Sequence, residues 1–500
     1  MTKPSPTPTN NIAAGNITAD NLATDITIVG SGLTALASAA LLAQANPEWR
    51  IALIRSASVL NSDTNADKKA NTTSIAETRP EDIRTTALST SSLEIFSSMG
   101  LYSAVEAESA AINTIQVSDR GHSGLSRLDS EPDAGPLGLV IENQRLSALL
   151  ETLLSQQHNV TQIEDMTVHT LQPKAKSISL TGGCLIEEIT TVSTHLLMIA
   201  DASSSPLRKQ LGIKQEVYDY HQTALVATLT LADAHRGVAY ERFTADGPMA
   251  LLPMTDAVDG EGPHEQHRAS LVWTLPSERA QQLQNQDQAQ AQLQKNLPEL
   301  FHAEFGDRAG AITAIGKPVF VPLQRKLAAE QVRSHVVLMG SAAQSLHPVA
   351  GQGFNLALRD IAALAETALI AHHQGRNLGE LPNLQRYLKT RERDQLRTVL
   401  LSHQLPKVFS SASAPMILGR NLGLMGLNLS PLLRQGFARQ ATGLGVRQAR
   451  IDPNYRRTDS RRTDDRRTNQ HLTPKTPNPG SLKPEGLNSD SQQNPSGGSA

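Results

Sequence analysis

The chain has 500 residues, of which 39% are hydrophobic and 19% charged, and its net charge is −2. Such a chain can bury a large core, and its length favours two or three domains. The balanced charge does not favour a nucleic-acid partner, and no apolar run approaches the roughly 18 residues that span a bilayer. Cys184 is the only cysteine, so an intrachain disulfide and a cysteine metal cluster are excluded. With no secretory pattern at the N-terminus, we expect a cytoplasmic protein.

Three segments have the composition of chain that does not fold by itself. Residues 1–23 are polar and rich in Pro, Thr and Asn, which predicts a disordered leader. Residues 61–74 resemble a loop insertion. Residues 447–500 predict a disordered tail, which contains the quasi-repeat "RRTDS", "RRTDD", "RRTNQ". The tail is either a solvated segment or an arginine-rich arm for anionic lipid or RNA, although its aspartates disfavour strong binding.

The first patterned residues predict a βαβ unit. The run "DITIVG" (25–30) is typical of a buried strand, "LTALASAALLAQA" (33–45) of a helix of small residues, and "WRIALIR" (49–55) of a second strand. Farther along the chain, five apolar runs predict strands at 195–201, 223–231, 250–254, 270–275 and 335–340. A polar, Gln-rich stretch predicts a helix at about 277–298. The middle of the chain is therefore expected to be strand-rich, between α/β ends.

A glycine fingerprint joins the first predicted strand to the first predicted helix. In Gly30-Ser31-Gly32-Leu33-Thr34-Ala35, Gly30 allows a tight turn, Gly32 allows the backbone to approach a pyrophosphate, and Ala35 keeps the helix close to the strand. A nucleotide site is the favoured interpretation, and an ordinary glycine-rich turn is the alternative. Arg55 stands where an acid usually holds the ribose. These residues alone therefore do not distinguish an NADP-binding dehydrogenase from a flavoprotein.

The longer motifs are more specific. The segments "SDRGHSG" (118–124), "YERFTADGPMALLPM" (240–254), "SLVWTLP" (270–276), "GSAAQSLHPVAGQGFNLALRD" (340–360) and "GRNLGLM" (419–425) resemble the FAD-dependent hydroxylases of ubiquinone synthesis, which have the p-hydroxybenzoate hydroxylase fold. The resemblance covers residues 24–445. It implies an α/β fold in which a Rossmann-like FAD-binding domain is interleaved with a strand-rich substrate domain, followed by C-terminal helices and disordered termini.

The resemblance also implies domain boundaries. The FAD-binding domain is expected at 24–212 and 316–395, with a part of the substrate domain near 101–140. The substrate-binding sheet is expected at 213–315, and a C-terminal helical region at 396–446. In the last region, the apolar stretch 414–437 is interpreted as helices packed on the flavin domain, with peripheral membrane contact as the alternative.

The implied cofactor is FAD, with NAD(P)H as electron donor and O2 as co-substrate. The loop 340–355 is expected to lie along the flavin, because its glycines let backbone N–H groups reach the ring, and a helix beginning near Asn355 would add its dipole. Arg84 is expected just before a helix-like run. The expected cofactor-binding residues are Gly30, Gly32, Ala35, Arg84, Asp201, Gly340, Ser341, Pro348, Gly351, Gln352, Gly353 and Asn355.

Two further residues depart from the family pattern. Ser341 replaces an aspartate but can still hydrogen-bond a phosphate or a ribityl hydroxyl. Ala202 replaces a glycine, and a positive φ there would cost about 1 kcal/mol or more. With Arg55, these changes call tight FAD binding into question.

The implied reaction is hydroxylation of a polyprenylated methoxyphenol through a flavin C4a-hydroperoxide. His347 is the candidate catalytic residue, which contacts the substrate or relays its proton, and the alternative is a histidine that only fixes the loop. No metal site is expected. The implied partners are the polyprenyl phenol and sister enzymes of the ubiquinone pathway, at the inner face of the cytoplasmic membrane. A flavin oxidoreductase for another aromatic or lipid substrate, and a cofactor-poor assembly subunit, stay open.

Overall fold

The computed structural model describes residues 11–13, 22–56, 84–119, 125–131, 135–183, 190–258, 265–284, 289–347 and 351–410. The chain divides into two compact units, Met1–Asp452 and Pro453–Ala500, and the second unit lies outside the described residues. The insertion 61–74, Cys184, Pro348, the apolar stretch 414–437 and the tail 447–500 lie outside them too. The expected leader 1–23 is described only at 11–13 and 22–23, and both segments lie in strands.

A nine-stranded sheet forms the base of the fold and contains the expected βαβ unit. Along its main path the strands are β1 (Asn11–Ala13), β9 (Val160–Glu164), β3 (Ile51–Ile54), β2 (Leu22–Val29), β12 (Thr190–Ile199), β11 (Ile178–Gly183) and β10 (Thr167–Pro173). β21 (Val336–Leu338) pairs with both β12 and β20 (Val332–Arg333). The pairs that join β9, β3, β2, β12 and β21 are parallel, and β3 and β21 are buried at every residue. Continuous apolar strands are typical of a parallel sheet covered on both faces.

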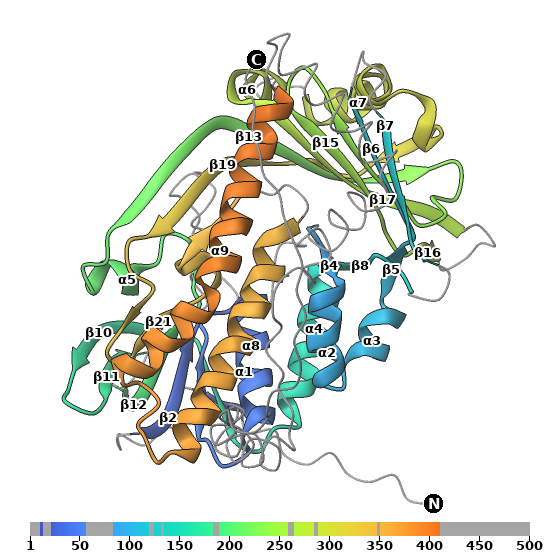
Figure 1. Cartoon of the computed structure of the whole chain (residues 1–500). Coiled ribbons are helices and arrows are strands. Elements are labelled where there is room, and N and C mark those ends of the chain that lie inside the picture. The colour runs from blue at the N-terminus through green and yellow to red at the C-terminus, as the bar shows by residue number, and fades with distance from the viewer. Residues whose placement is uncertain are drawn as a thin grey trace, which may run out of the picture. The chain divides into compact units, whose positions relative to one another are not determined.

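Helices cover this sheet. α1 (Leu33–Ala45) packs against α4 (Asn143–Ser155) and α8 (Gln352–His373), and small alanines let the three approach closely. α9 (Leu381–Ser410) runs alongside α8, as Figure 1 shows. The shorter helices are α2 (Thr90–Ser98), α3 (Tyr102–Ala107) and α5 (Pro206–Gln210). No helix among the described residues is both long and apolar enough to cross a bilayer.

A second sheet has ten strands. Along its main path they are β22 (Gln344–Ser345), β19 (Val319–Ala328), β13 (Gln215–Leu231), β17 (Glu265–Pro276), β15 (Pro248–Pro253), β14 (Val238–Phe243), β6 (Thr114–Asp119) and β7 (Leu125–Asp129). β16 (Ala257–Val258) and β18 (Ile312–Ile315) pair at its side. α6 (Ser277–Gln284) and α7 (Ala289–Phe305) cover one face, where Trp273 is fully buried (Figure 1).

A small three-stranded sheet lies between the two large ones. It consists of β4 (Thr85–Ser89), β8 (Gly138–Glu142) and β5 (Ser109–Ile112). The Oγ1 atom of Thr85 donates a hydrogen bond of 3.0 Å to the Oγ atom of Ser270 in β17. β4 therefore connects the base of the fold to the uncovered face of the ten-stranded sheet.

The fold class is the expected one, but several local expectations are corrected. The Gln-rich stretch forms two helices, α6 and α7, and not one at 277–298. Arg84 precedes a strand, β4, and not a helix. α9 begins at Leu381, ahead of the expected region 396–446. β19 was expected within the FAD-binding segment 316–395, yet it pairs with β13 in the ten-stranded sheet.

Candidate active site

The turn after β2 brings the glycine fingerprint against the end of β12. Gly30 has a φ of +153°, and a Cβ added there would lie 2.3 Å from the carbonyl oxygen of Ala200. Only glycine fits this approach. Gly32 is the N-cap of α1 and provides no side-chain cap, and a Cβ on it would meet nothing within 4 Å. Ala35 is fully buried beneath the turn. The first turn of α1 thus faces open space, which suits an anionic group.

The loop after β21 lies against the same turn. Gly340 has a φ of +59°, and a Cβ there would lie 2.8 Å from the Thr34 side chain. The next residue, Ser341, is exposed, so its hydroxyl is accessible to a ligand. Arg208 connects this loop to the segment after β12. Its guanidinium donates hydrogen bonds to the carbonyl oxygens of Ala342 at 3.1 Å and Ser203 at 2.9 Å.

Asp201 follows β12, and only one of its two carboxylate oxygens has a hydrogen-bond partner among the described residues. Its Oδ2 accepts a hydrogen bond of 2.9 Å from Ser205, whereas Oδ1 is buried with no partner among the described residues. Burial raises the pKa of Asp201 to about 6, against the lowering effects of the Ser205 hydrogen bond and the Arg208 charge. Ala202 is not among the residues with positive φ, so the expected conformational penalty does not arise.

The N-terminus of α8 is the second part of the candidate cofactor site. Gly351, in the left-handed conformation at φ 60°, is the N-cap, and α8 begins at Gln352, three residues before the expected start near Asn355. A Cβ on Gly353 would meet nothing within 4 Å. This end of α8 also lacks a side-chain cap, so its backbone N–H groups are suited to an electron-rich ring edge.

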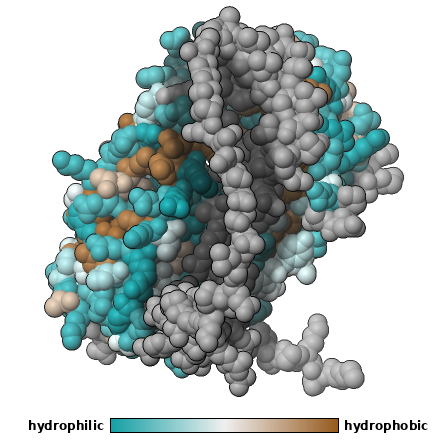
Figure 2. All heavy atoms as spheres, in the orientation of Figure 1, coloured by the Kyte–Doolittle hydropathy of each residue, from teal (hydrophilic) through white to brown (hydrophobic). Residues whose placement is uncertain are grey.

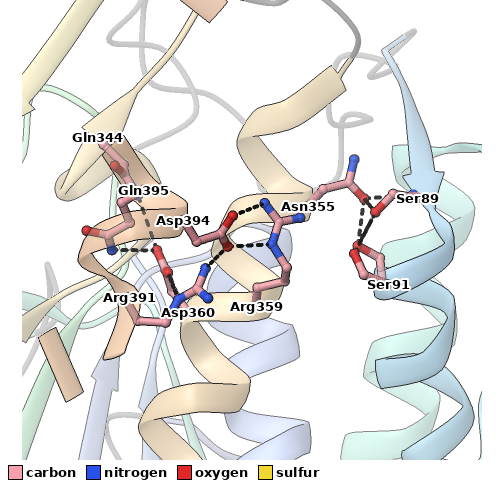
Figure 3. Close-up of polar contacts among 10 residues, drawn as sticks. Ser89, Ser91, Gln344, Asn355, Arg359, Asp360, Arg391, Asp394 and Gln395 are labelled. Atoms are coloured by element: carbon pink, nitrogen blue, oxygen red, sulfur yellow. Dashed lines mark hydrogen bonds and ion pairs between the residues drawn. The ribbon is translucent and has the colours of Figure 1, made fainter. Parts of the chain in front are cut away.

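Asn355 is used by the protein itself. Its Nδ2 donates to the carbonyl oxygens of Ala87 at 2.7 Å and Gly351 at 2.9 Å. Its Oδ1 accepts from Ser92 at 2.6 Å and from the backbone N–H of Ser89 at 2.9 Å (Figure 3). The side chain is 1% exposed. The Asn355 amide thus fixes the start of α8 against β4 and α2, and its expected contact with the cofactor stays a prediction.

His347 lies at the end of the described part of the loop. It is 1% exposed, and neither ring nitrogen has a hydrogen-bond partner among the described residues. Its ring packs edge-on against Tyr220, with 4.9 Å between centroids, and the Tyr220 hydroxyl lies 3.0 Å from Nδ1 of His403 on α9. Burial, with a smaller effect of His403, lowers the pKa of His347 to about 4, so the ring is neutral near pH 7.

A buried ion cluster supports the loop from α8 and α9. Nε of Arg359 donates to Asp394 at 2.8 Å, and Arg391 bonds both Asp394 and Asp360 (Figure 3). Oδ2 of Asp360 accepts from Gln344, which lies in the loop, at 3.1 Å. Sequence reasoning missed this cluster, although the i,i+3 spacing of Arg391 and Asp394 was a signal.

Arg55 was the residue that left the cofactor undecided. Its guanidinium bonds Glu151 at 2.8 Å and Glu164 at 3.2 Å, and the residue is 9% exposed. Two carboxylates therefore balance its charge, and it does not present an uncompensated cation to a nucleotide phosphate.

The structure brings most of the predicted residues together. Gly30, Gly32, Ala35 and Gly340 meet around the first turn of α1, and Asp201 directly follows Ala200, which contacts Gly30. Gly351 and Asn355 meet at Ala87 of β4. Arg84 is exposed just ahead of β4. Pro348 lies outside the described residues, and no group of three or more candidate metal ligands occurs in the part of the chain that is described.

Comparison with known proteins identifies the family. The family described as "FAD binding domain" matches residues 23–396. The chain belongs to the FAD-dependent aromatic monooxygenase family. Ubiquinone hydroxylase UbiL of Rhodospirillum rubrum is 30% identical over 364 residues, which are 72% of this chain and 80% of the relative. The human mitochondrial ubiquinone biosynthesis monooxygenase COQ6 is 29% identical over 398 residues, which cover 71% of this chain and 81% of the relative.

The fold is shared with a solved structure of the same class. The p-nitrophenol 4-monooxygenase PnpA of Pseudomonas putida DLL-E4 has a TM-score of 0.65 and 14% identity, over 85% of this chain and 100% of that one. The cofactor of this monooxygenase is FAD, and the family typically uses NAD(P)H and O2.

The described residues of this monooxygenase fit FAD. Two glycines, Gly32 and Gly353, border open space at two uncapped helix N-termini, and Asp201 retains a buried acceptor without a partner. A pyrophosphate at α1, a ribityl hydroxyl at Asp201 and the flavin ring at α8 would satisfy these groups.

Proposed function

We propose that the protein is a phenol hydroxylase of ubiquinone biosynthesis, of the 2-octaprenyl-6-methoxyphenol hydroxylase type. The supporting observation is His347. His347, a neutral and buried imidazole that ends the described part of the cofactor loop, has two ring nitrogens with no partner among the described residues. Such nitrogens are costly unless a ligand satisfies them. The names of the UbiL and COQ6 relatives support ubiquinone biosynthesis as the pathway.

FAD, when bound, supplies the activated oxygen that is transferred to the ring. The protein then has to bind the substrate, orient it and exclude water from the site. Gly30, Gly32 and Ala35 hold the pyrophosphate at α1. Asp201 and Ser341 hold the ribityl chain. Gly340, Gly351, Gln352 and Gly353 would bring backbone N–H groups to the ring. Arg84, and Pro348 outside the described residues, are proposed as further cofactor-binding residues.

His347 serves as an acceptor and donor at the substrate side. Because it is neutral near pH 7, its protonated nitrogen can donate a hydrogen bond to a substrate oxygen, and its other nitrogen can accept one. Tyr220 holds the ring edge-on and is itself hydrogen-bonded to His403, so the ring orientation is fixed from β13 and α9.

We also propose peripheral contact with the inner face of the cytoplasmic membrane, where a polyprenyl tail resides, in a complex with other enzymes of the pathway. α9 exposes Leu396, Leu400 and Leu401, with exposed fractions of 57%, 47% and 41%. Figure 2 shows hydrophobic atoms gathered among hydrophilic ones on the viewed face of the molecule. The apolar stretch 414–437, which carries the rest of this proposal, lies outside the described residues.

The decisive experiment is anaerobic loading with FAD, followed by NAD(P)H, O2 and a 2-polyprenyl-6-methoxyphenol. We expect flavin absorbance that persists after desalting and a product heavier by one oxygen atom. His347→Ala should retain FAD and lose most product formation. A wild-type protein that binds FAD but hydroxylates only unrelated aromatics would favour the alternative of a different substrate. A protein that never binds FAD would favour a non-catalytic assembly subunit.

A further inference from the structure

The ten-stranded sheet has one row of side chains that crosses five strands and points away from α6 and α7. The register aligns Val226 of β13 with Val272 of β17, Val272 with Ala250 of β15, Ala250 with Glu241 of β14, and Glu241 with Val117 of β6. Residues in register lie on the same face of a sheet. We call these five residues the floor row.

The two faces of the sheet differ in burial at the floor row. On the helix-covered face, Met249, Leu271 and Trp273 are 0% exposed. On the other face, their neighbours Val272, Ala250, Glu241 and Val117 all retain accessible surface. A strand whose two faces differ in this way packs a core on one side and leaves the other side more accessible.

This face of the sheet lies near the cofactor loop. Ala239, two residues before Glu241 and on the same face, belongs to a hydrophobic cluster that includes Ala87 of β4. A Cβ added to Gly351 would lie 3.6 Å from Ala87. At the other side of the floor, Tyr220 of β13 contacts His347. Glu241 and β13 are separated by three strand spacings, about 14 Å, and Tyr220 lies six residues along β13 from the floor-row residue Val226, so Glu241 and His347 border different ends of this face.

Glu241 is the one ionisable member of the floor row. It has no hydrogen bond and no ion pair anywhere in the described part of the chain, and burial raises its pKa to about 7. The adjacent cation, Arg242, faces the opposite side, where its Nε donates to the carbonyl oxygen of Glu304 at 2.8 Å. Asp119 lies on the floor side at the end of β6, so the nearest charged neighbour on this face is also an acid. An unpaired carboxyl in apolar surroundings is costly, which marks it as a group kept for a ligand.

We propose that Glu241 selects neutral phenols, because its carboxylate accepts the hydrogen bond of the substrate hydroxyl. This inference rests on the proposed hydroxylase function and adds a specificity residue to it. When the proton moves, the phenol O–H bond breaks, a new O–H bond forms on the Glu241 carboxyl, and the electron pair stays on the phenol oxygen. The negative charge passes to the ring, which becomes a better nucleophile. An aromatic acid, such as a hydroxybenzoate, is repelled by the same carboxylate.

The test uses the FAD-loaded full chain and two ligands, 2-methoxyphenol with a short 6-prenyl chain and 4-hydroxybenzoate. Binding is followed by the change in flavin fluorescence. Wild type should bind the phenol and reject the benzoate. Glu241→Gln should weaken phenol binding about 10- to 100-fold, as expected for a lost hydrogen bond to a charged group. It should also bind the benzoate more tightly and divert NAD(P)H oxidation from product to peroxide.

Glu299→Gln is the matched control, because Glu299 is exposed on α7 and so lies beyond the opposite face of the sheet. It should match wild type in every measurement. Ala250→Leu fills the floor beside Glu241 without changing charge and should also weaken phenol binding. The proposal is overturned if Glu241→Gln leaves phenol affinity and coupling unchanged, or if wild type binds both ligands equally. These binding results stand even if wild type hydroxylates no phenol, in which case only the hydroxylase function fails.

Discussion

A Cβ on Gly340 would lie 2.8 Å from both Cγ2 and Oγ1 of Thr34, so the cofactor loop and α1 approach as closely as glycine allows. Gly353, in the same loop region, has open space around it. We therefore expect Gly340→Ala to destabilise the flavin-free protein by about 1–3 kcal/mol, through the contact and the positive φ. Gly353→Ala should leave the flavin-free protein as stable or slightly more stable, since alanine favours helix, but should weaken FAD binding. Urea unfolding and flavin titration of both variants separate the two effects.

Asp394 is held between two arginines in a buried cluster. Burial opposes its ionisation, but the charges of Arg359 and Arg391 outweigh that effect and lower the pKa of Asp394. Asp394→Asn leaves those charges unbalanced, so we expect a loss of about 3–5 kcal/mol at pH 7. A carboxyl group whose pKa is lowered in the folded protein stabilises the fold at pH values above its pKa in the unfolded chain. This contribution is lost as the pH falls through the folded-state pKa. Wild type should therefore lose more stability than the variant on acidification. Glu392→Gln, at an exposed position on the same helix, is the control.

Arg55 is predicted to stabilise the fold and not to recognise the 2′-phosphate of NADP. Its replacement by Gln leaves Glu151 and Glu164 without their shared cation, and we expect a loss of about 1–3 kcal/mol. The ratio of kcat/KM for NADPH to that for NADH should stay within about twofold of wild type, far less than the roughly tenfold change that 1.4 kcal/mol represents. A selective loss of NADPH activity would instead restore the dehydrogenase-like role considered from the sequence.

Glu241 should make the stability depend on pH in the opposite sense to Asp394. Its pKa is raised from 4.5 to about 7 by burial. Between these values the unfolded chain releases a proton that the folded chain retains, so stability falls as pH rises, and the loss is complete above pH 7. Glu241→Gln should be more stable than wild type by about 1–3 kcal/mol at pH 8, and the difference should shrink toward pH 4. Equal pH profiles in urea unfolding would contradict this assignment.

The exposed leucines of α9 predict lipid binding. Replacing Leu396, Leu400 and Leu401 with serine removes apolar area from an exposed helix face, so the variant should sediment less with vesicles that contain anionic lipid. Its melting temperature should change little because these side chains are largely accessible. Vesicle binding equal to that of wild type would assign membrane contact to other residues.

The base of the fold was predictable because its pattern is local. α1 was expected at 33–45 and spans Leu33–Ala45, since small apolar residues, a glycine turn and a following strand act within a short window. The small residues of the loop around Gly340 are also a local signal, but its place along the flavin came from the family resemblance and stays a prediction. Features that depend on contacts between residues far apart in the sequence could not be predicted from the sequence. The ion pairs of Arg55 join residues about a hundred positions apart in sequence, and the isolation of Glu241 depends on which strands flank β14. Asn355 was assigned to the cofactor because nothing local indicates that Ala87 and Ser89 occupy its amide.

After β21 the chain passes directly from the nine-stranded sheet to the ten-stranded sheet. β21 pairs with β12 in the base, and six residues after its end β22 pairs with β19 next to β13. A change of strand register in the ten-stranded sheet would therefore move the cofactor loop. An exchange of side chains along the floor row would not. Point substitutions on the floor row should therefore change the substrate preference of this chain and leave FAD bound, whereas an insertion within β13 or β19 should weaken FAD binding.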